Sequence, residues 1–262
     1  MEENKNDSIM SPNYVPDELK TPYDIVELPS QGLLYKNKKG KVKVEYLTAM
    51  DESILTSPNL SKNPSLMINV LLKRKVKDLD FDPEELLEGD RIALLLFLRV
   101  TGIGEKYHQI VYDTNANDFV EGEIDLTGLK QKKLLIKPDE RNEFDFILPI
   151  KKYNIKYRLL TSKDEDEISK QNENLMKRDP DKVSTINLLR LERSIMEING
   201  ERDKMKISNI IKNLPLMDSR AIKTHIEEME PGIILKTVAR IQGGESVDCF
   251  LRVGQNFFFP KL

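Results

Sequence analysis

The residue types that could perform chemistry are few and scattered in this chain. A single cysteine, Cys249, and two histidines, His108 and His225, occur among 262 residues. One cysteine excludes a disulfide within the chain and a zinc site built on several thiolates. The histidines lie far apart, and neither has a second histidine or a cysteine at ligand spacing. We therefore predict no metal and interpret both histidines as surface or packing residues.

The carboxylates gather in runs rather than in pairs from separate segments. Four consecutive acids, Asp164 to Glu167, stand at an expected helix start, where they favour the positive end of the helix dipole. An acid–base pair needs two carboxyl groups in different environments. Cys249 alternates with Val247 and Leu251, as in a strand with one apolar face, and is expected to be an inert core thiol. The sequence thus predicts no catalytic residues and no enzyme.

The stretch DRIALLLFLRVTGIGEKY, residues 90–107, resembles a glycine-rich phosphate loop only superficially. In phosphate loops a strand leads into glycines, and a helix N-terminus then faces the phosphate. Here helix-forming residues precede Gly102 and Gly104, and a strand-like alternation follows them. We predict a buried helix capped by Asp90 and ended by Gly102 in the left-handed conformation. No nucleotide or other cofactor is expected.

Composition and charge narrow the function classes further. The net charge is −3, and the lysine-rich runs 36–43 and 73–77 lie among acids, which argues against a duplex nucleic-acid binder. No apolar run approaches the roughly 20 residues that span a bilayer. The first 20 residues lack the apolar segment of a signal peptide, so we expect a cytosolic protein. Residues 1–22 have little apolar surface to bury and are predicted to be an extended arm.

The same order of features occurs twice along the chain. Each copy has Leu-Pro, then a tyrosine, then an extended run that ends in Leu-Thr, with an acidic helix start three residues later. A helix with an early aspartate and two strand-like runs joined by a turn come after these features. The corresponding residues are Leu28, Tyr35, Thr48, Asp51 and Asp90 in the first copy, and Leu148, Tyr153, Thr161, Asp164 and Asp218 in the second.

This pattern predicts an α+β fold with two topologically similar halves, produced by internal duplication. Residues 23–140 and 141–262 would each hold an opening strand, capped helices and a β-hairpin. The second half would carry an extra helical or hairpin insertion near residues 183–214. Within it, Leu188 and Leu191 have helical spacing, whereas Asn199-Gly200 is a strong hairpin turn. Chance recurrence of common capping and turn chemistry is the alternative to duplication.

Three consecutive aromatic residues, Phe257, Phe258 and Phe259, stand near the end of the chain. A strand would direct Phe257 and Phe259 to one face and Phe258 to the other. In one interpretation, two of the rings dock into the chain's own core. In the other, the triplet or its outward member is an aromatic anchor that binds a partner. These three residues are the candidate partner-binding residues.

Five segments, in this order, resemble the baseplate hub proteins of T-even-type, contractile-tailed bacteriophages. They span residues 28–260 and read LPSQGLLY, VEYLTAMDESILTSPNL, EGDRIALLLFLRVTGIGEKY, LPLMDSRAIKTHIEEMEPGI and NFFFP. The resemblance implies a role in building or forming the centre of a tail baseplate, without an active site. Members of that family often carry Cys-x-x-Cys pairs in the two hairpins, which would bind zinc. The corresponding stretches here, YDTNAND and ARIQGGE, contain no cysteine, so tight turns must serve instead.

The resemblance implies other phage tail or baseplate proteins as partners, or self-association. The charge balance argues against nucleic acid as a partner, and no membrane segment is expected. The protein would then be found in the host cytoplasm during assembly or in the baseplate of the virion. Two alternatives stay open. A phage-encoded or bacterial enzyme would show a pocket lined by acids from separate segments, for example Asp51 with Asp164. A nucleic-acid-binding protein would use the lysine-rich turns and be retained on DNA in a salt-dependent way.

Overall fold

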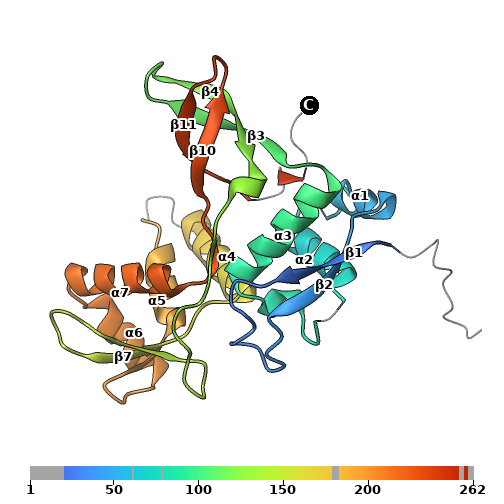
Figure 1. Ribbon diagram of the computed structural model, residues 1–262. Coiled ribbons are helices and arrows are strands. Elements are labelled where there is room, and N and C mark those ends of the chain that lie inside the picture. The colour runs from blue at the N-terminus through green and yellow to red at the C-terminus, as the bar shows by residue number, and fades with distance from the viewer. Residues whose placement is uncertain (1–20, 61, 78, 179–182, 254–256, 259–262) are drawn as a thin grey trace, which may run out of the picture.

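The computed structural model describes residues 21–60, 62–77, 79–178, 183–253 and 257–258. The predicted N-terminal arm, apart from residues 21 and 22, lies outside the described residues, and so does Phe259. The fold is mixed α and β, as predicted. Figure 1 shows a helical body from which a sheet formed by β3, β4, β10 and β11 projects.

The first half contains a two-stranded sheet, three α-helices and a long hairpin. Its elements are β1 (Tyr23–Glu27), β2 (Lys41–Glu45), α1 (Ala49–Leu55), α2 (Pro64–Lys75), η2 (Pro83–Glu85), α3 (Glu88–Gly102), β3 (Lys106–Asp113), β4 (Asp118–Asp125), η3 (Leu126–Gly128) and β5 (Gln131–Lys132).

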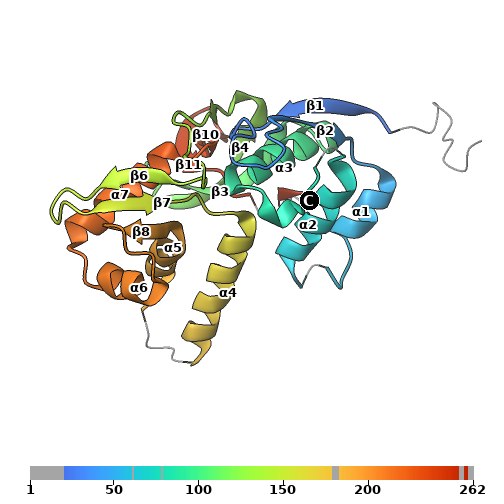
Figure 2. The ribbon, with the colours of Figure 1, turned by 90° about the horizontal axis from the view of Figure 1, so that it is seen from below.

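The second half also has an antiparallel strand pair, then helices and then a hairpin, with additional elements among its helices and a short strand, β9, before its hairpin. Its elements are β6 (Phe144–Ile147), β7 (Asn154–Tyr157), α4 (Ser162–Arg178), α5 (Ile186–Ser194), β8 (Ile195–Ile198), α6 (Lys204–Lys212), α7 (Leu216–Met229), β9 (Gly232–Ile233), β10 (Lys236–Ile241) and β11 (Ser246–Phe250). Figure 2 shows α4 between the helices of the two halves, with α1 and α2 to one side and α5 and α6 to the other.

The two halves correspond in element order and in one specific contact. In each half an antiparallel strand pair, β1–β2 or β6–β7, is followed by a helix that starts after Leu-Thr. Asp90 is the third residue of α3 and Asp218 is the third residue of α7. Asp90 accepts a bond from the backbone N–H of Ser30 (2.9 Å), and Asp218 accepts one from that of Ile150 (2.7 Å). A common origin of the halves stays a prediction.

The prediction that Asp90 caps the N-terminus of α3 is wrong, but Asp90 still has a structural role. Leu87 precedes the first residue of α3, and Asp90 lies inside the helix. Its carboxylate also accepts the hydroxyl protons of Ser30 (2.5 Å) and Tyr35 (2.6 Å). These donors hold the carboxylate away from the helix's own N–H groups, so Asp90 ties the loop after β1 to α3.

Gly102 does not take the left-handed conformation that the sequence suggested. It is the last residue of α3, and Ile103 ends the helix. A Cβ atom at Gly102 would lie 2.6 Å from the Leu47 side chain, so the glycine is there for close packing. Gly104 has the positive φ, +134°, that turns the chain into β3.

Thr48 and Thr161 begin their helices as the sequence predicted. The backbone N–H of Thr48 donates to Asp51 (2.8 Å), and that of Thr161 donates to Asp164 (2.9 Å). These two bonds complete the same capping arrangement at α1 and at α4. The repeated Leu-Thr motif therefore serves the same purpose in both halves.

The insertion in the second half contains both a helix and a tight turn, the two structures that its sequence suggested. Residues 186–194 form α5, and β8 then pairs with β7 rather than with a second long strand. Asn199 and Gly200 have φ values of +50° and +86°, as in a tight turn, and bring Glu201 back to Ile198. Helix α6 ends at Lys212, so Leu214 lies beyond it, contrary to its helical spacing.

Strands from both halves share one sheet. The four strands lie in the order β11–β10–β4–β3, with Arg240 opposite Glu123 where the halves meet. A Cβ atom at Gly122 would lie 2.7 Å from the Cβ of Ala239, so a glycine permits this close approach. One hydrophobic cluster runs through both halves. The halves are therefore parts of one packed unit rather than independent bodies.

Candidate interaction surface

Phe257 and Phe258 lie in the interior rather than on the surface. Phe257 is 0% exposed and Phe258 is 2% exposed. The ring centroid of Phe257 lies 5.1 Å from that of Tyr107 on β3 and 5.7 Å from that of Phe258. Both residues form a short turn and not a strand, which corrects the predicted alternation. Their positions agree with the core interpretation, and a partner could reach either ring only after the segment had left its pocket.

Arg99 holds this segment in place. Its guanidinium is buried and donates to the backbone carbonyls of Phe257 (2.9 Å), Gly104 (2.8 Å) and Lys106 (3.1 Å). Burial lowers the pKa of Arg99. Since all three acceptors are carbonyls, the side chain fixes the helix end, the start of β3 and the chain terminus relative to one another.

The tip of the β3–β4 hairpin exposes a cluster of apolar side chains. Ile110, Tyr112 and Phe119 are 60%, 44% and 68% exposed. Tyr112 lies directly opposite Phe119, and their rings meet edge to face at 5.2 Å. Among the described residues, four aromatic side chains are exposed, and three of them lie on this sheet, Phe250 being the third. We refer to Ile110, Tyr112 and Phe119 as the aromatic tip.

Side-chain hydrogen bonds form the turn of this hairpin. The backbone N–H of Asn115 donates to Asp113 (2.8 Å), and the Tyr112 hydroxyl donates to Asn117 (2.5 Å). Asn117 takes a positive φ of +55°, which asparagine tolerates. The stretch YDTNAND therefore makes a tight turn, as predicted. The hydroxyl of Tyr112 is thereby tied to the turn.

The two outer strands of the sheet are bridged by a side chain. The amide of Gln109 on β3 donates to the carbonyl of Phe250 (3.0 Å) and accepts from the N–H of Arg252 (3.2 Å). On the exposed face, Lys106 pairs with Glu123 (2.7 Å), and His108 lies within 3.7 Å of Glu121 and 3.6 Å of Glu123. A charged band thus borders the aromatic tip, as the rim of a protein interface borders its apolar centre.

The remaining residues considered for chemistry are packing residues or ion pairs. The ring of His225 lies 4.5 Å from that of Phe146, and burial lowers its pKa. Burial also raises the pKa of the Cys249 thiol, which keeps it protonated. Asp51 pairs with Lys75 (2.5 Å), and Asp164 pairs with Arg158 (2.7 Å). Although burial acts in the opposite direction, hydrogen bonds from these cations and from Thr48 and Thr161 lower the pKa of both carboxylates.

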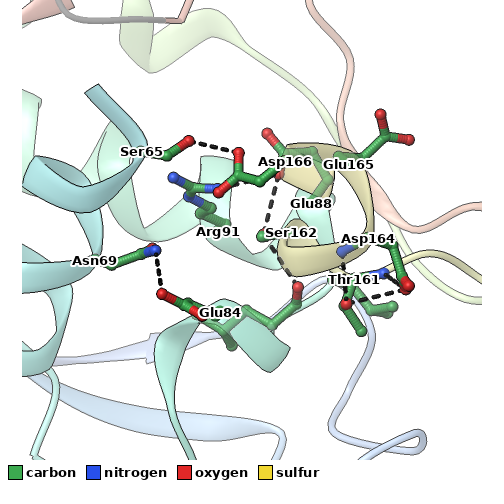
Figure 3. A network of polar contacts seen from close by, with 12 residues as sticks. Ser65, Asn69, Glu84, Glu88, Arg91, Thr161, Ser162, Asp164, Glu165 and Asp166 are labelled. Carbon is green, nitrogen blue, oxygen red and sulfur yellow. Dashed lines mark hydrogen bonds and ion pairs between the residues drawn. The ribbon is translucent and has the colours of Figure 1, made fainter. Parts of the chain in front are cut away.

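A polar network joins the two halves at the start of α4. Figure 3 shows Asp166 receiving a bond from Ser65 of α2 (2.5 Å), and Ser162 bonded to Glu88 of α3 (3.0 Å). The Ser162 hydroxyl also lies 3.1 Å from the carbonyl of Leu86. Beside this network lies a pocket of about 320 Å³ that residues of α3, α4, α5 and α7 line. Strand and helix periodicity indicated neither the pocket nor the aromatic tip.

Comparisons with protein-family models, curated proteins and solved structures gave no match. Within the described ranges, no helix has the length and apolar character needed to cross a membrane. In the same ranges, no three or more histidine, cysteine, aspartate or glutamate side chains are grouped so that they could hold a metal ion.

Proposed function

We propose that this protein is a structural or assembly component of a contractile phage tail. It would form or help to build the central baseplate hub through protein–protein contacts, in the host cytoplasm and in the virion baseplate. The aromatic tip is the observation that carries the proposal. The exposed aromatic side chains lie on a sheet that projects from the body (Figure 1) and have the composition of interface centres.

The ordered motifs provide the second support. LPSQGLLY supplies Ser30 and Tyr35, which bind Asp90 of EGDRIALLL, and LPLMDSRAI supplies Asp218. Two of the segments that resemble baseplate hub proteins are therefore bonded to each other in the interior of the body. In this proposal they form a scaffold, and the hairpins that they carry make the contacts with partners.

The pocket beside α4 does not provide the acid–base pair that an enzyme would need. Four glutamates line it, namely Glu88, Glu165, Glu227 and Glu230, and Glu227 is exposed to solvent. Glu165 is held at two points by Arg190 (2.8 and 3.1 Å), and Glu88 accepts the Ser162 hydroxyl proton. One uncommitted carboxylate does not make an acid–base pair. The pocket therefore favours binding over catalysis.

Electron microscopy of tails from phage that lack this gene tests the assignment. We expect tails without a normal baseplate, because the centre of the hub would be missing or misassembled. Normal baseplates in such particles would contradict the proposal. Identification of the proteins that co-purify with the chain from infected cells would then name its partners.

The double substitution Tyr112→Ala with Phe119→Ala tests the aromatic tip. We expect at least about tenfold less baseplate protein recovered with the variant, since interface aromatics often contribute about 2 kcal/mol each. The unfolding temperature should fall only slightly, because both side chains are exposed and the lost bond from Tyr112 to Asn117 lies at the surface. Tyr23→Ala, an exposed aromatic on β1, is the matched control and should bind as the natural chain does. Unchanged recovery with the double variant would exclude the tip as the contact surface.

A further inference from the structure

The pocket between the two halves has apolar walls and an acidic end. Leu160, Leu191 and Ile226 supply aliphatic surface, while Glu88, Glu165, Glu227 and Glu230 supply carboxylates. Two cations, Arg190 and Lys223, also line it. Its volume of about 320 Å³ is at the lower end of the range that binds small molecules or single side chains.

The charges of the pocket do not cancel. Four carboxylates face two cations, and Arg190 is already committed to Glu165 through three hydrogen bonds. Glu88 has Arg91 at 3.8 Å, at the limit of an ion pair, and burial raises the pKa of Glu88. The carboxylates that line the pocket therefore outnumber its lining cations, although the charges of Arg91 and Lys132 also act on Glu88 and Glu230 from outside the lining.

Glu230 is the uncommitted group. It ends α7, and only its backbone N–H is engaged, by the carbonyl of Ile226 (2.8 Å). No described residue donates a hydrogen bond or an ion pair to its carboxylate. Burial, followed by the charge of Glu165, raises its pKa to about 7, with Glu88 acting in the same direction and Lys132 and Arg190 opposing. A partly buried carboxyl group without a partner is stabilised either by protonation, which the raised pKa reflects, or by a cation that meets the carboxylate.

We infer that this pocket binds a single alkyl cation, the guanidinium or ammonium group of an arginine or lysine side chain presented by another protein chain. The cationic group would meet Glu230 and Glu88, and the aliphatic stem would lie against Leu160, Leu191 and Ile226. A free diamine has the same chemistry at one end. Its second ammonium group would meet Arg190 and Lys223, so a monocation is favoured. This inference does not rest on the assignment to a phage tail.

Methyl NMR of the full chain tests the inference with two probes, N-acetyl-arginine amide and putrescine. We expect saturable shifts of the Leu160, Leu191 and Ile226 methyl signals with millimolar N-acetyl-arginine amide, and weaker binding of putrescine. Tighter binding of putrescine would replace the side-chain source by a free diamine and overturn the proposal. Absence of saturable shifts with both probes would overturn it as well.

The substitution Glu230→Gln keeps the shape of the side chain and removes its charge. Above pH 7 we expect about tenfold weaker binding of N-acetyl-arginine amide, because a charge-assisted bond is lost. The natural chain should also bind more weakly as the pH falls through about 7, where Glu230 gains a proton. That pH dependence should be smaller in the variant.

Glu245→Gln, on the exposed turn between β10 and β11, is the matched control and should bind as the natural chain does. Thermal unfolding of each variant shows that the fold is kept. Equal affinity of the natural chain and Glu230→Gln at both pH values would show that Glu230 does not hold the cation, and the proposal would fail.

Discussion

Phe257→Ala is expected to lower the free energy of unfolding by about 3–5 kcal/mol, the range found when a large core aromatic is truncated. The ring is fully buried against Tyr107 and Phe258. Its removal would leave a cavity beneath β3, because Arg99 fixes the backbone of the same residue and limits collapse of the site. Urea unfolding followed by circular dichroism measures the change.

Phe250→Ala is the matched control for that experiment. Phe250 is 62% exposed, so its truncation should change the free energy of unfolding by less than about 0.5 kcal/mol. If Phe257→Ala left stability unchanged and abolished partner binding, the anchor interpretation of the terminal aromatics would be correct instead.

Asp90→Ala is the second substitution with a large expected effect, a loss of about 4 kcal/mol. The carboxylate is 0% exposed and accepts three bonds, from the N–H and hydroxyl of Ser30 and from the hydroxyl of Tyr35. Alanine would leave all three donors buried without an acceptor. Burial and the neighbouring Asp90 raise the pKa of Tyr35, so its hydroxyl stays a donor at any pH used.

Asp218→Ala provides the matched comparison in the second half. Asp218 accepts only two bonds, from the backbone N–H groups of Ile150 and Lys151. Ile150 is 52% exposed, so water can reach this loop and replace part of what is lost. We expect a loss of about 1–2 kcal/mol. An effect of Asp90→Ala no larger than that of Asp218→Ala would contradict the prediction, because it would show that the two hydroxyl bonds to Asp90 add no stability beyond that of its backbone bond.

Local chemistry made several elements predictable from the sequence. Asn63-Pro64 starts α2, where the Asn63 side chain accepts the N–H of Leu66 (3.2 Å). Alternation gave β3 with its correct limits, Lys106–Asp113. In these cases the determining residues lie within a few positions of one another, so spacing alone carries the information.

Long-range contacts account for what the sequence did not reveal. Asp90 resembles an N-cap until Ser30 and Tyr35, more than 50 positions earlier, are seen to bind it. The pairing of β4 with β10 joins segments more than 100 positions apart, and no local pattern encodes it. Alternation placed Ile110 and Tyr112 on one face of a strand, but which face is exposed depends on that pairing.

The pocket could not be predicted from the sequence for the same reason. Glu88 lies in α3, Glu165 lies in α4 and Glu230 directly follows α7, and each resembles an ordinary surface acid in its own segment. Only the packing of α3, α4 and α7 brings them together. A search for acids near expected helix ends would have found Glu88 and Glu230 without indicating that they meet.

Because of the shared sheet and the position of Phe257, the first half cannot complete its packing until the second half has been synthesised. Tyr107, Arg99 and β4 belong to the first half, yet β10 and the aromatic residues that complete their packing emerge from the ribosome last. Until then, the first half has an unpaired strand edge and an open core, which exposes it to proteases and to aggregation. A nascent chain that stalls before residue 236 lacks β10 and Phe257, so it cannot form the shared sheet or the packing around Tyr107.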